Sequence, residues 1–178
     1  PMGSLALAGI PGGLLVLDLS DPSQPARLAV AATSGSVNDI QLEGTLAYVA
    51  AGSAGLLVVD VSNPTVAPPR GSAPVVGGRM AIQGDYAYVS GFAAGVHVLD
   101  RSDPLAPELI TTIDTPGNAV DVDAVGGLLH VAAEVEGLQI IDNTNPEAPA
   151  LLGAIDTPGY ARSVAVSGSY AYVADDYV

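Results

Sequence analysis

The sequence predicts an all-β fold: a β-propeller, or part of one, built from four-stranded antiparallel blades in about four repeats of 42 residues. Three observations predict it. One strand-like segment recurs four times, a second recurs five times in the same period, and Gly- and Pro-rich turns separate the copies. Because one four-stranded sheet cannot bury both of its faces, units of this length are expected to stack as blades.

The first recurring segment is expected to form the third strand of each blade. Its copies occupy residues 13–18, 55–60, 95–100 and 137–142. Each copy ends in an aspartate, and these lie 42, 40 and 42 residues apart: Asp18, Asp60, Asp100 and Asp142. Ser, Thr and Asx residues and then a proline follow each one, which is turn chemistry. Because the aspartates recur in every unit, we interpret them as turn or inter-blade hydrogen-bonding residues rather than as a functional set.

The second recurring segment is expected to form the second strand. Its copies are LAYVA, YAYVS, LLHVA and YAYVA, at residues 46–50, 86–90, 128–132 and 170–174, with a weaker copy, SLALA, at 4–8. Large residues alternate with small ones, which is the period of a strand rather than of a helix. Tyr48, Tyr88 and Tyr172 are expected to pack between blades. His130 takes this place in one copy, and we interpret it and His97 as structural, since neither has a Ser or Cys partner in a recognised context.

Composition limits the possible functions. The 178 residues are 49% apolar, enough for a packed core, and include 21 Gly and 14 Pro. There are 19 acidic residues against five arginines and no lysine, a net charge of −14, which disfavours nucleic-acid binding. No apolar stretch is long enough to span a membrane. The absence of cysteine excludes a disulfide framework and a thiolate metal site.

The recurring unit, GLxVID-S-P preceded by YAYVA and followed by TPG, resembles the LVIVD-repeat family of β-propeller proteins. This family is found largely among bacterial and archaeal surface or secreted proteins. The resemblance covers about residues 5–178 and implies a propeller fold and an extracellular or cell-surface location. It brings no catalytic residues. Residues 1–4, Pro-Met-Gly-Ser, look like the remnant of a cleaved expression tag, and residues 5–178 are expected to form a single repeat domain.

The chain starts and stops at a second-strand segment, which leaves three alternatives for closure. It is a fragment of a longer propeller, half of a ring completed by a second copy, or a small four-bladed closure. We expect residues 161–166 and 170–174 to complete the sheet begun by residues 14–18, either within the chain or across two chains. A homodimer or completion by further blades is therefore expected, because unpaired edges and an open apolar face favour association.

Candidate site residues are sought where the repeat is broken on the loop face, since repeated residues serve folding. The ligand-binding candidates are Asn38, Asp39, Arg79, Asn118, Asp121, Tyr160 and Arg162. Asp121 with Arg79 or Arg162 is interpreted as an ion pair. Hard oxygen ligands for Ca²⁺ could come from Glu134, Glu136, Asp175 and Asp176, although no Asp-x-Asp-x-Asp-Gly loop is present. Solvated turn acids are the alternative interpretation, and no other cofactor is expected.

Two functional hypotheses follow. The favoured one is a non-catalytic extracellular or cell-surface module for protein or glycan recognition, or for scaffolding. The alternative is a hydrolase or metal-assisted enzyme with its site at the channel mouth. A pocket with clustered acids would favour the enzyme, and a flat or filled mouth would favour binding. Fold class alone does not choose between them.

Overall fold

A computed structural model describes residues 4–176, and all seventeen regular elements in this range are β-strands. They form five antiparallel sheets of three, four, four, four and two strands. The predicted all-β class and four-stranded antiparallel sheets are confirmed. There are five sheets rather than four, because the first and last copies of the second-strand segment each lie in a smaller sheet. Between residues 4 and 176 no helix exists that could span a lipid bilayer.

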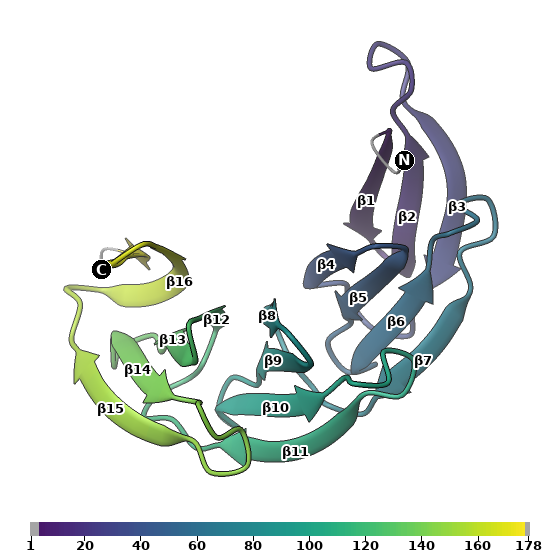
Figure 1. The fold of residues 1–178 in the computed structure, drawn as a ribbon. Helices are drawn as coiled ribbons and strands as arrows, with labels where there is room; N and C mark the ends of the chain where they lie inside the picture. The colour runs from purple at the N-terminus through teal and green to yellow at the C-terminus, as the bar shows by residue number, and fades with distance from the viewer. Residues whose placement is uncertain (1–3, 177–178) are drawn as a thin grey trace. The chain divides into compact units, whose positions relative to one another are not determined.

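The chain divides into two compact units, and each is described by itself. The first comprises residues 4–77 and 104–106, with a three-stranded and a four-stranded sheet (Figure 1). The three-stranded sheet has the order β1 (Leu5–Ile10), β2 (Gly13–Asp18) and β3 (Ala26–Ala32). The four-stranded sheet has the order β4 (Asp39–Glu43), β5 (Leu46–Ala50), β6 (Leu56–Asp60) and β7 (Pro69–Ala73).

The second unit comprises residues 78–103 and 107–176 and holds two four-stranded sheets and one two-stranded sheet. The first of these sheets contains β8 (Met80–Gln83), β9 (Tyr86–Ser90), β10 (Val96–Asp100) and β11 (Glu108–Ile113). The next contains β12 (Asp121–Val125), β13 (Leu128–Ala132), β14 (Leu138–Asp142) and β15 (Ala150–Ile155). The last contains β16 (Tyr160–Ser167) and β17 (Tyr170–Asp176). Strand β12 contacts both β8 and β16, so the middle sheet packs between the other two.

The expected third strands are β2, β6, β10 and β14. The last three begin one residue later than the sequence pattern indicates, at Leu56, Val96 and Leu138. In all four sheets that have a third and a fourth strand, the ladder between them shifts register two residues before the closing aspartate, as at Val98/Leu99. A repeated β-bulge of this kind bends the outer strand at the same place in each sheet.

The closing aspartates make turns, as the sequence predicts. The carboxylate of each accepts a hydrogen bond from the backbone N–H two residues later, at 2.7–2.9 Å, in Asp18, Asp60, Asp100 and Asp142. In Asp142, hydrogen bonds from the backbone and hydroxyl of Thr144 hold the carboxyl pKa below its ordinary value. These residues therefore end the third strands and are not gathered into a site.

The core of the second unit lies between successive sheets. Tyr88 on β9 is 2% exposed, and its hydroxyl accepts a 2.8 Å hydrogen bond from the amide of Asn143, which follows β14. In the first unit Tyr48 is also buried. The expectation that Tyr172 packs in the same way is wrong: it is 61% exposed. Strand β17 has β16 as its sole partner among the described strands, so no third strand covers its ring.

Strands β16 and β17 form a sheet of the second unit, and β2 belongs with β1 and β3 to a sheet of the first unit. The expected completion of the β2 sheet by residues 161–166 and 170–174 stays a prediction.

Candidate functional site

A backbone bridge repeated between successive sheets positions the site. In the loops that follow β9 and β13, Phe92 and Glu134 adopt positive φ angles of 55° and 49°. Each then exchanges two backbone hydrogen bonds with the segment that opens the next sheet, Phe92 with Ala119 and Glu134 with Ala161. A left-handed conformation is uncommon for residues with a side chain and persists where surrounding structure enforces it. The bridge therefore fixes where the Glu134 side chain projects.

A polar network surrounds Glu134. Its Oε2 accepts a 2.8 Å hydrogen bond from the side-chain amide of Asn118, and its Oε1 lies 2.7 Å from Nη1 of Arg162. The Nε of Arg162 donates to Asp176 at 2.9 Å. The guanidinium also lies over the ring of Tyr160, with 5.1 Å between its carbon and the ring centroid. Five sequence-predicted residues thus meet in one network, and they come from the segments that open two sheets, from the β13–β14 loop and from the end of β17.

Arg162 is the centre of this network. It occupies the register shift between Ala161 and Ser163, where β16 has one residue more than β17. This bulge turns its side chain out of the ladder. The hydrogen bond to Asp176, together with the charges of Glu134 and Asp176, raises the pKa of the guanidinium above its ordinary value. The side chain remains 44% exposed, so a ligand could reach it.

Asp121 and Asp123 connect the middle sheet of this unit to β16. Asp121 is 6% exposed, and its Oδ2 accepts hydrogen bonds from the hydroxyl of Ser163 and from the backbone N–H of Val164, the latter at 3.0 Å. Asp123 accepts from the backbone N–H of Val166 at 2.7 Å. The interpretation of Asp121 as one half of an arginine ion pair is therefore wrong. The hydrogen bonds to this carboxylate come instead from Ser163 and Val164 of strand β16.

Asp175 holds the loop that leads into β16. Its two carboxylate oxygens accept hydrogen bonds from the hydroxyl of Thr157 at 2.7 Å and from the backbone N–H of Gly159 at 2.8 Å. This loop leads into β16, the strand on which Tyr160 and Arg162 lie. Asp175 is thus a positioning residue.

The other predicted residues lie elsewhere. Asn38 and Asp39 belong to the first unit, where the amide of Asn38 donates to the carbonyl of Gly77 at 3.0 Å. Arg79 immediately precedes β8, and its backbone N–H donates to the hydroxyl of Ser90 at 2.8 Å. Glu136 is exposed and lines a shallow pocket beside Gln139. None of these four has a described hydrogen bond to the Arg162 network.

The four acids considered for Ca²⁺ are not gathered into a metal-binding group. Within residues 4–176 no set of three or more His, Cys, Asp or Glu side chains is placed to hold a metal ion. Glu134 and Asp176 bind Arg162, and Asp175 binds its own loop. The calcium hypothesis stays a prediction.

Sequence reasoning missed two serines. Ser90 is completely buried, and its hydroxyl contacts the carbonyls of Arg79 and Val120 at 3.1 and 3.2 Å, which ties two sheets together. Ser163 donates to Asp121. Ser90 replaces the alanine that ends the other copies of its strand, such as Ala132, so the break in the repeat was a usable signal. Ser163 occupies the first-strand position that holds Asp39 in β4 and Asp121 in β12. This break in the repeat was therefore a usable signal as well.

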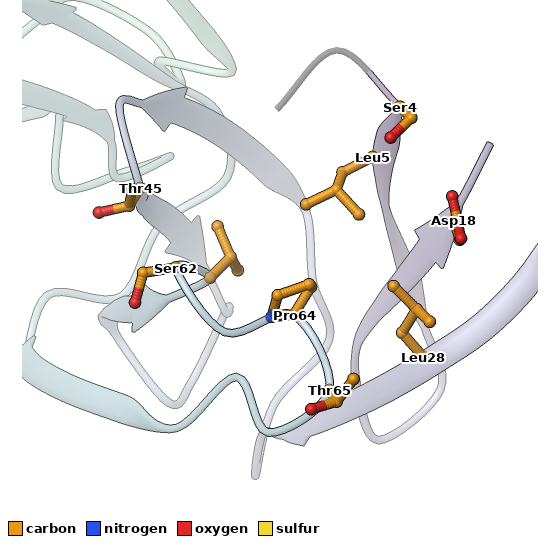
Figure 2. A pocket seen from close by; sticks show the side chains of 9 residues that line it. Ser4, Leu5, Asp18, Leu28, Thr45, Ser62, Pro64 and Thr65 are labelled. Carbon is orange, nitrogen blue, oxygen red and sulfur yellow. The ribbon is translucent and has the colours of Figure 1, made fainter. Parts of the chain in front are cut away.

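A pocket in the first unit is lined by both apolar and polar residues. It has a volume of about 540 Å³. Figure 2 shows Leu5, Leu28 and Pro64 around its interior, with Asp18, Ser62 and Thr65 near its margin. Among the described residues that line it, Asp18 alone is ionisable, and its carboxylate already accepts a 2.8 Å hydrogen bond from Ser20. The pocket therefore offers apolar contacts and several Ser and Thr residues, but no second ionisable side chain among its described lining residues.

The two histidines lie on strands. His97 on β10 shares a 2.9 Å hydrogen bond with the hydroxyl of Thr112 on β11. His130 on β13 lines a small pocket with Tyr170, and its Nδ1 is buried without a hydrogen-bond partner. Neither has a described hydrogen bond to the Arg162 network, and their structural interpretation stays a prediction.

Comparisons with known proteins bear on the family and the fold. The family model described as LVIVD repeat matches five segments: residues 8–30, 34–67, 77–115, 116–157 and 158–177. No protein of curated function matches the chain. Among solved structures, it is similar to a functionally unknown protein from Desulfotomaculum acetoxidans DSM 771, with a TM-score of 0.78 and 16% identity. It is also similar to the computationally designed protein Ika8, with a TM-score of 0.76 and 11% identity.

Both similarities concern the fold, given the low identities. Each covers 97% of this chain, but only 59% of the Desulfotomaculum protein and 52% of Ika8. The chain thus spans little more than half the length of the structures it matches.

Proposed function

Because the chain belongs to the LVIVD repeat family, we propose that it is a non-catalytic recognition module of propeller type that works outside the cell or at its surface. Its ligand is a protein or a glycan, and the binding surface is the polar network around Arg162. The extracellular location is the expectation that the family resemblance carries. The strongly acidic, lysine-free composition suits a highly soluble exported module.

The single observation that supports this proposal is the convergence of repeat-breaking residues. Asn118, Glu134, Arg162 and Asp176 break the repeat, and they form one hydrogen-bonded network. Exposed polar residues held rigidly by a scaffold are typical of binding surfaces. Tyr160 adds an aromatic face, and Arg and Tyr are among the residues enriched at recognition sites.

The geometry favours recognition over catalysis. Both oxygens of Glu134 accept hydrogen bonds, from Asn118 and from Arg162, which suits a residue that presents a fixed surface. A glycosidase needs one carboxyl group poised to donate a proton and a second placed across the substrate. Here Glu134 and Asp176 instead hold the same arginine.

A glycan array and a cell-surface protein display library, both probed with the labelled wild-type chain, test the proposal. Arg162→Ala should abolish binding of any hit, because it removes the group that joins Glu134 to Asp176. Glu134→Gln should weaken binding less, since the amide keeps the shape and one acceptor. Arg70→Ala is the matched control, because Arg70 is another exposed arginine paired with an aspartate, Asp60, but in the other unit.

Binding that survives Arg162→Ala unchanged would contradict the proposed surface. The hydrolase alternative would be established instead if the wild-type chain cleaved an array glycan and both Glu134→Gln and Asp176→Asn abolished this cleavage. Circular dichroism of each variant distinguishes loss of the surface from loss of the fold.

A further inference from the structure

The two-stranded sheet is an incomplete copy of the sheets that precede it. Strand β17 pairs with β16 in the way that β13 pairs with β12, and it carries the same Tyr-Ala-Tyr-Val sequence as β9. In the sheet of β9, a third strand, β10, occupies the other edge with Tyr88 opposite Val98. In the described chain this edge of β17 has no partner. Its backbone groups form a template for a strand of the GLxVxD type.

The three-stranded sheet carries a complementary defect. Strands β2 and β3 are a third and a fourth strand with the usual bulge, and β1 serves as the second. Among the described strands, no first strand pairs with β1. Strand β1 is the weakest copy of the second strand, with Leu7 at the tyrosine position opposite Val16. Among the described strands the second-strand type therefore occurs five times and the third-strand type four times, and the two incomplete sheets together contain every strand of one complete sheet.

An apolar surface adjoins the incomplete sheet. In the sheet of β8 to β11, Ile113 on the outer strand is 8% exposed. Ile155, at the matching register opposite Leu138, is 62% exposed. Leu152 and Tyr170 are exposed as well. A third and fourth strand added beyond β17 would extend the sheet that packs on the middle sheet and would cover apolar surface of this kind.

We infer that two copies of this chain exchange these elements. Strand β17 of each copy takes the place of β1 on the other copy's β2, so that β16, β17 and the second copy's β2 and β3 form a complete four-stranded sheet. The exchange is reciprocal and gives a two-fold symmetric dimer with two such sheets. This chain spans 52% of Ika8, so two copies together would match its length, whereas it spans 59% of the Desulfotomaculum protein, which two copies would exceed.

The register of the exchange follows from the complete sheets. Tyr48 lies opposite Val58 and Tyr88 opposite Val98, in each case two residues before the closing aspartate. In the exchanged sheet, Tyr172 therefore lies opposite Val16 of the second copy. In the structure of the single chain, Val16 instead lies opposite Leu7. The ring of Tyr172 gains the cover that Tyr88 has, and this offsets the loss of the β1 ladder.

Disulfide trapping tests this register, and the chain has no cysteine of its own to interfere. The double variant Val16→Cys/Tyr172→Cys, oxidised while the protein is folded, should give a disulfide-linked dimer on non-reducing gels. Residues directly opposite in an antiparallel pair are within reach of a disulfide. In wild-type chain, light scattering should give twice the mass of one chain, falling toward a single chain on dilution.

The matched control is Leu7→Cys/Val16→Cys. Its disulfide fixes β1 on β2 within one chain and should keep the protein monomeric, and reduction should restore the dimer. A disulfide that joins positions 16 and 172 of the double variant within one chain would overturn the inference, because it would mean that the sheet closes within that chain. Wild-type chain that remains a monomer at millimolar concentration would also overturn it, and β17 would then fit a further repeat in a longer protein. The wild-type mass decides the matter if the cysteine variants do not fold.

Discussion

Strands β9 and β17 share the sequence Tyr-Ala-Tyr-Val and pair with first strands of the same kind, and yet their surroundings differ. Tyr88 is 2% exposed and Tyr172 is 61% exposed. Strand β9 lies between β8 and β10 and packs on the next sheet, whereas β17 pairs with β16 alone among the described strands. The repeat sequence therefore specifies a strand locally. Burial depends on how many strands and sheets stand beside it.

The largest difference between β9 and β17 is expected when the tyrosine ring of each strand is removed. Tyr88→Ala should lower the free energy of unfolding by about 4 kcal/mol, because it leaves a cavity and an unpaired Asn143. Tyr172→Ala should change it by less than about 0.5 kcal/mol in dilute solution. Urea unfolding at micromolar concentration measures both. Equal losses would mean that Tyr172 is buried in the monomer, contrary to the comparison.

Two glycines extend the same contrast. Gly95 has a φ of 84°, and a Cβ there would clash with the carbonyl oxygen of Ile113. Gly95→Ala should cost about 3 kcal/mol through strain and overpacking. Gly153 lies on the uncovered outer strand β15, and a Cβ added there would have no other atom within 4 Å. Gly153→Ala should be neutral or stabilising by about 0.5 kcal/mol. Thermal melts compare the two, and a costly Gly153→Ala would indicate that β15 is covered.

Asp121 tests what holds the two-stranded sheet in place. Asp121→Ala leaves Ser163 and the Val164 N–H without their acceptor and should cost about 2 kcal/mol. Hydrogen exchange at Val164 should accelerate far more than exchange in β9. Asp123→Ala, which removes one bond to Val166, serves as the milder control. Unchanged exchange in β16 would show that packing, rather than this carboxylate, retains the sheet.

A smaller effect is expected at the turns that follow the third strands. Among the described strands, no third strand pairs with β17. The pKa of Asp142 lies below its ordinary value of 3.8, mainly through the backbone hydrogen bond from Thr144 and then through its hydroxyl. The stabilisation is therefore complete above this ordinary value and is lost as pH falls through the lower folded pKa. Asp142→Asn, which keeps an acceptor but does not titrate, should flatten the fall of Tm below about pH 4. An identical pH profile for the variant would exclude this contribution.

Much of the fold could be predicted, because it depends on local patterns. The period of the closing aspartates located β2, β6, β10 and β14 to within a residue, since turn chemistry acts over a few neighbouring residues. The five-sheet division and the exposure of Tyr172 could not be predicted, because they depend on which strands find partners. The single-domain hypothesis for residues 5–178 stays a prediction, and so does the tag remnant at residues 1–4, of which the first three lie outside the described residues.

The site was predictable in part for the same reason. Asn118, Glu134, Tyr160, Arg162 and Asp176 break the repeat, and this singled them out. That they form one network depends on the Glu134–Ala161 bridge and on the bulge at Arg162, which no spacing reveals. Asp121 looked equally suitable from its sequence position, but its carboxylate serves β16 instead.

Among the described strands, β17 is a second strand without a third beside it, and hydrogen exchange of the β9 and β17 amides across a dilution series examines this without any substitution. We expect β9 amides to stay protected close to the level of global unfolding at every concentration. Amides of β17 should exchange rapidly in dilute chain and become protected as concentration rises. Equal protection of both strands in the dilute monomer would show that β17 already has its partner within one chain.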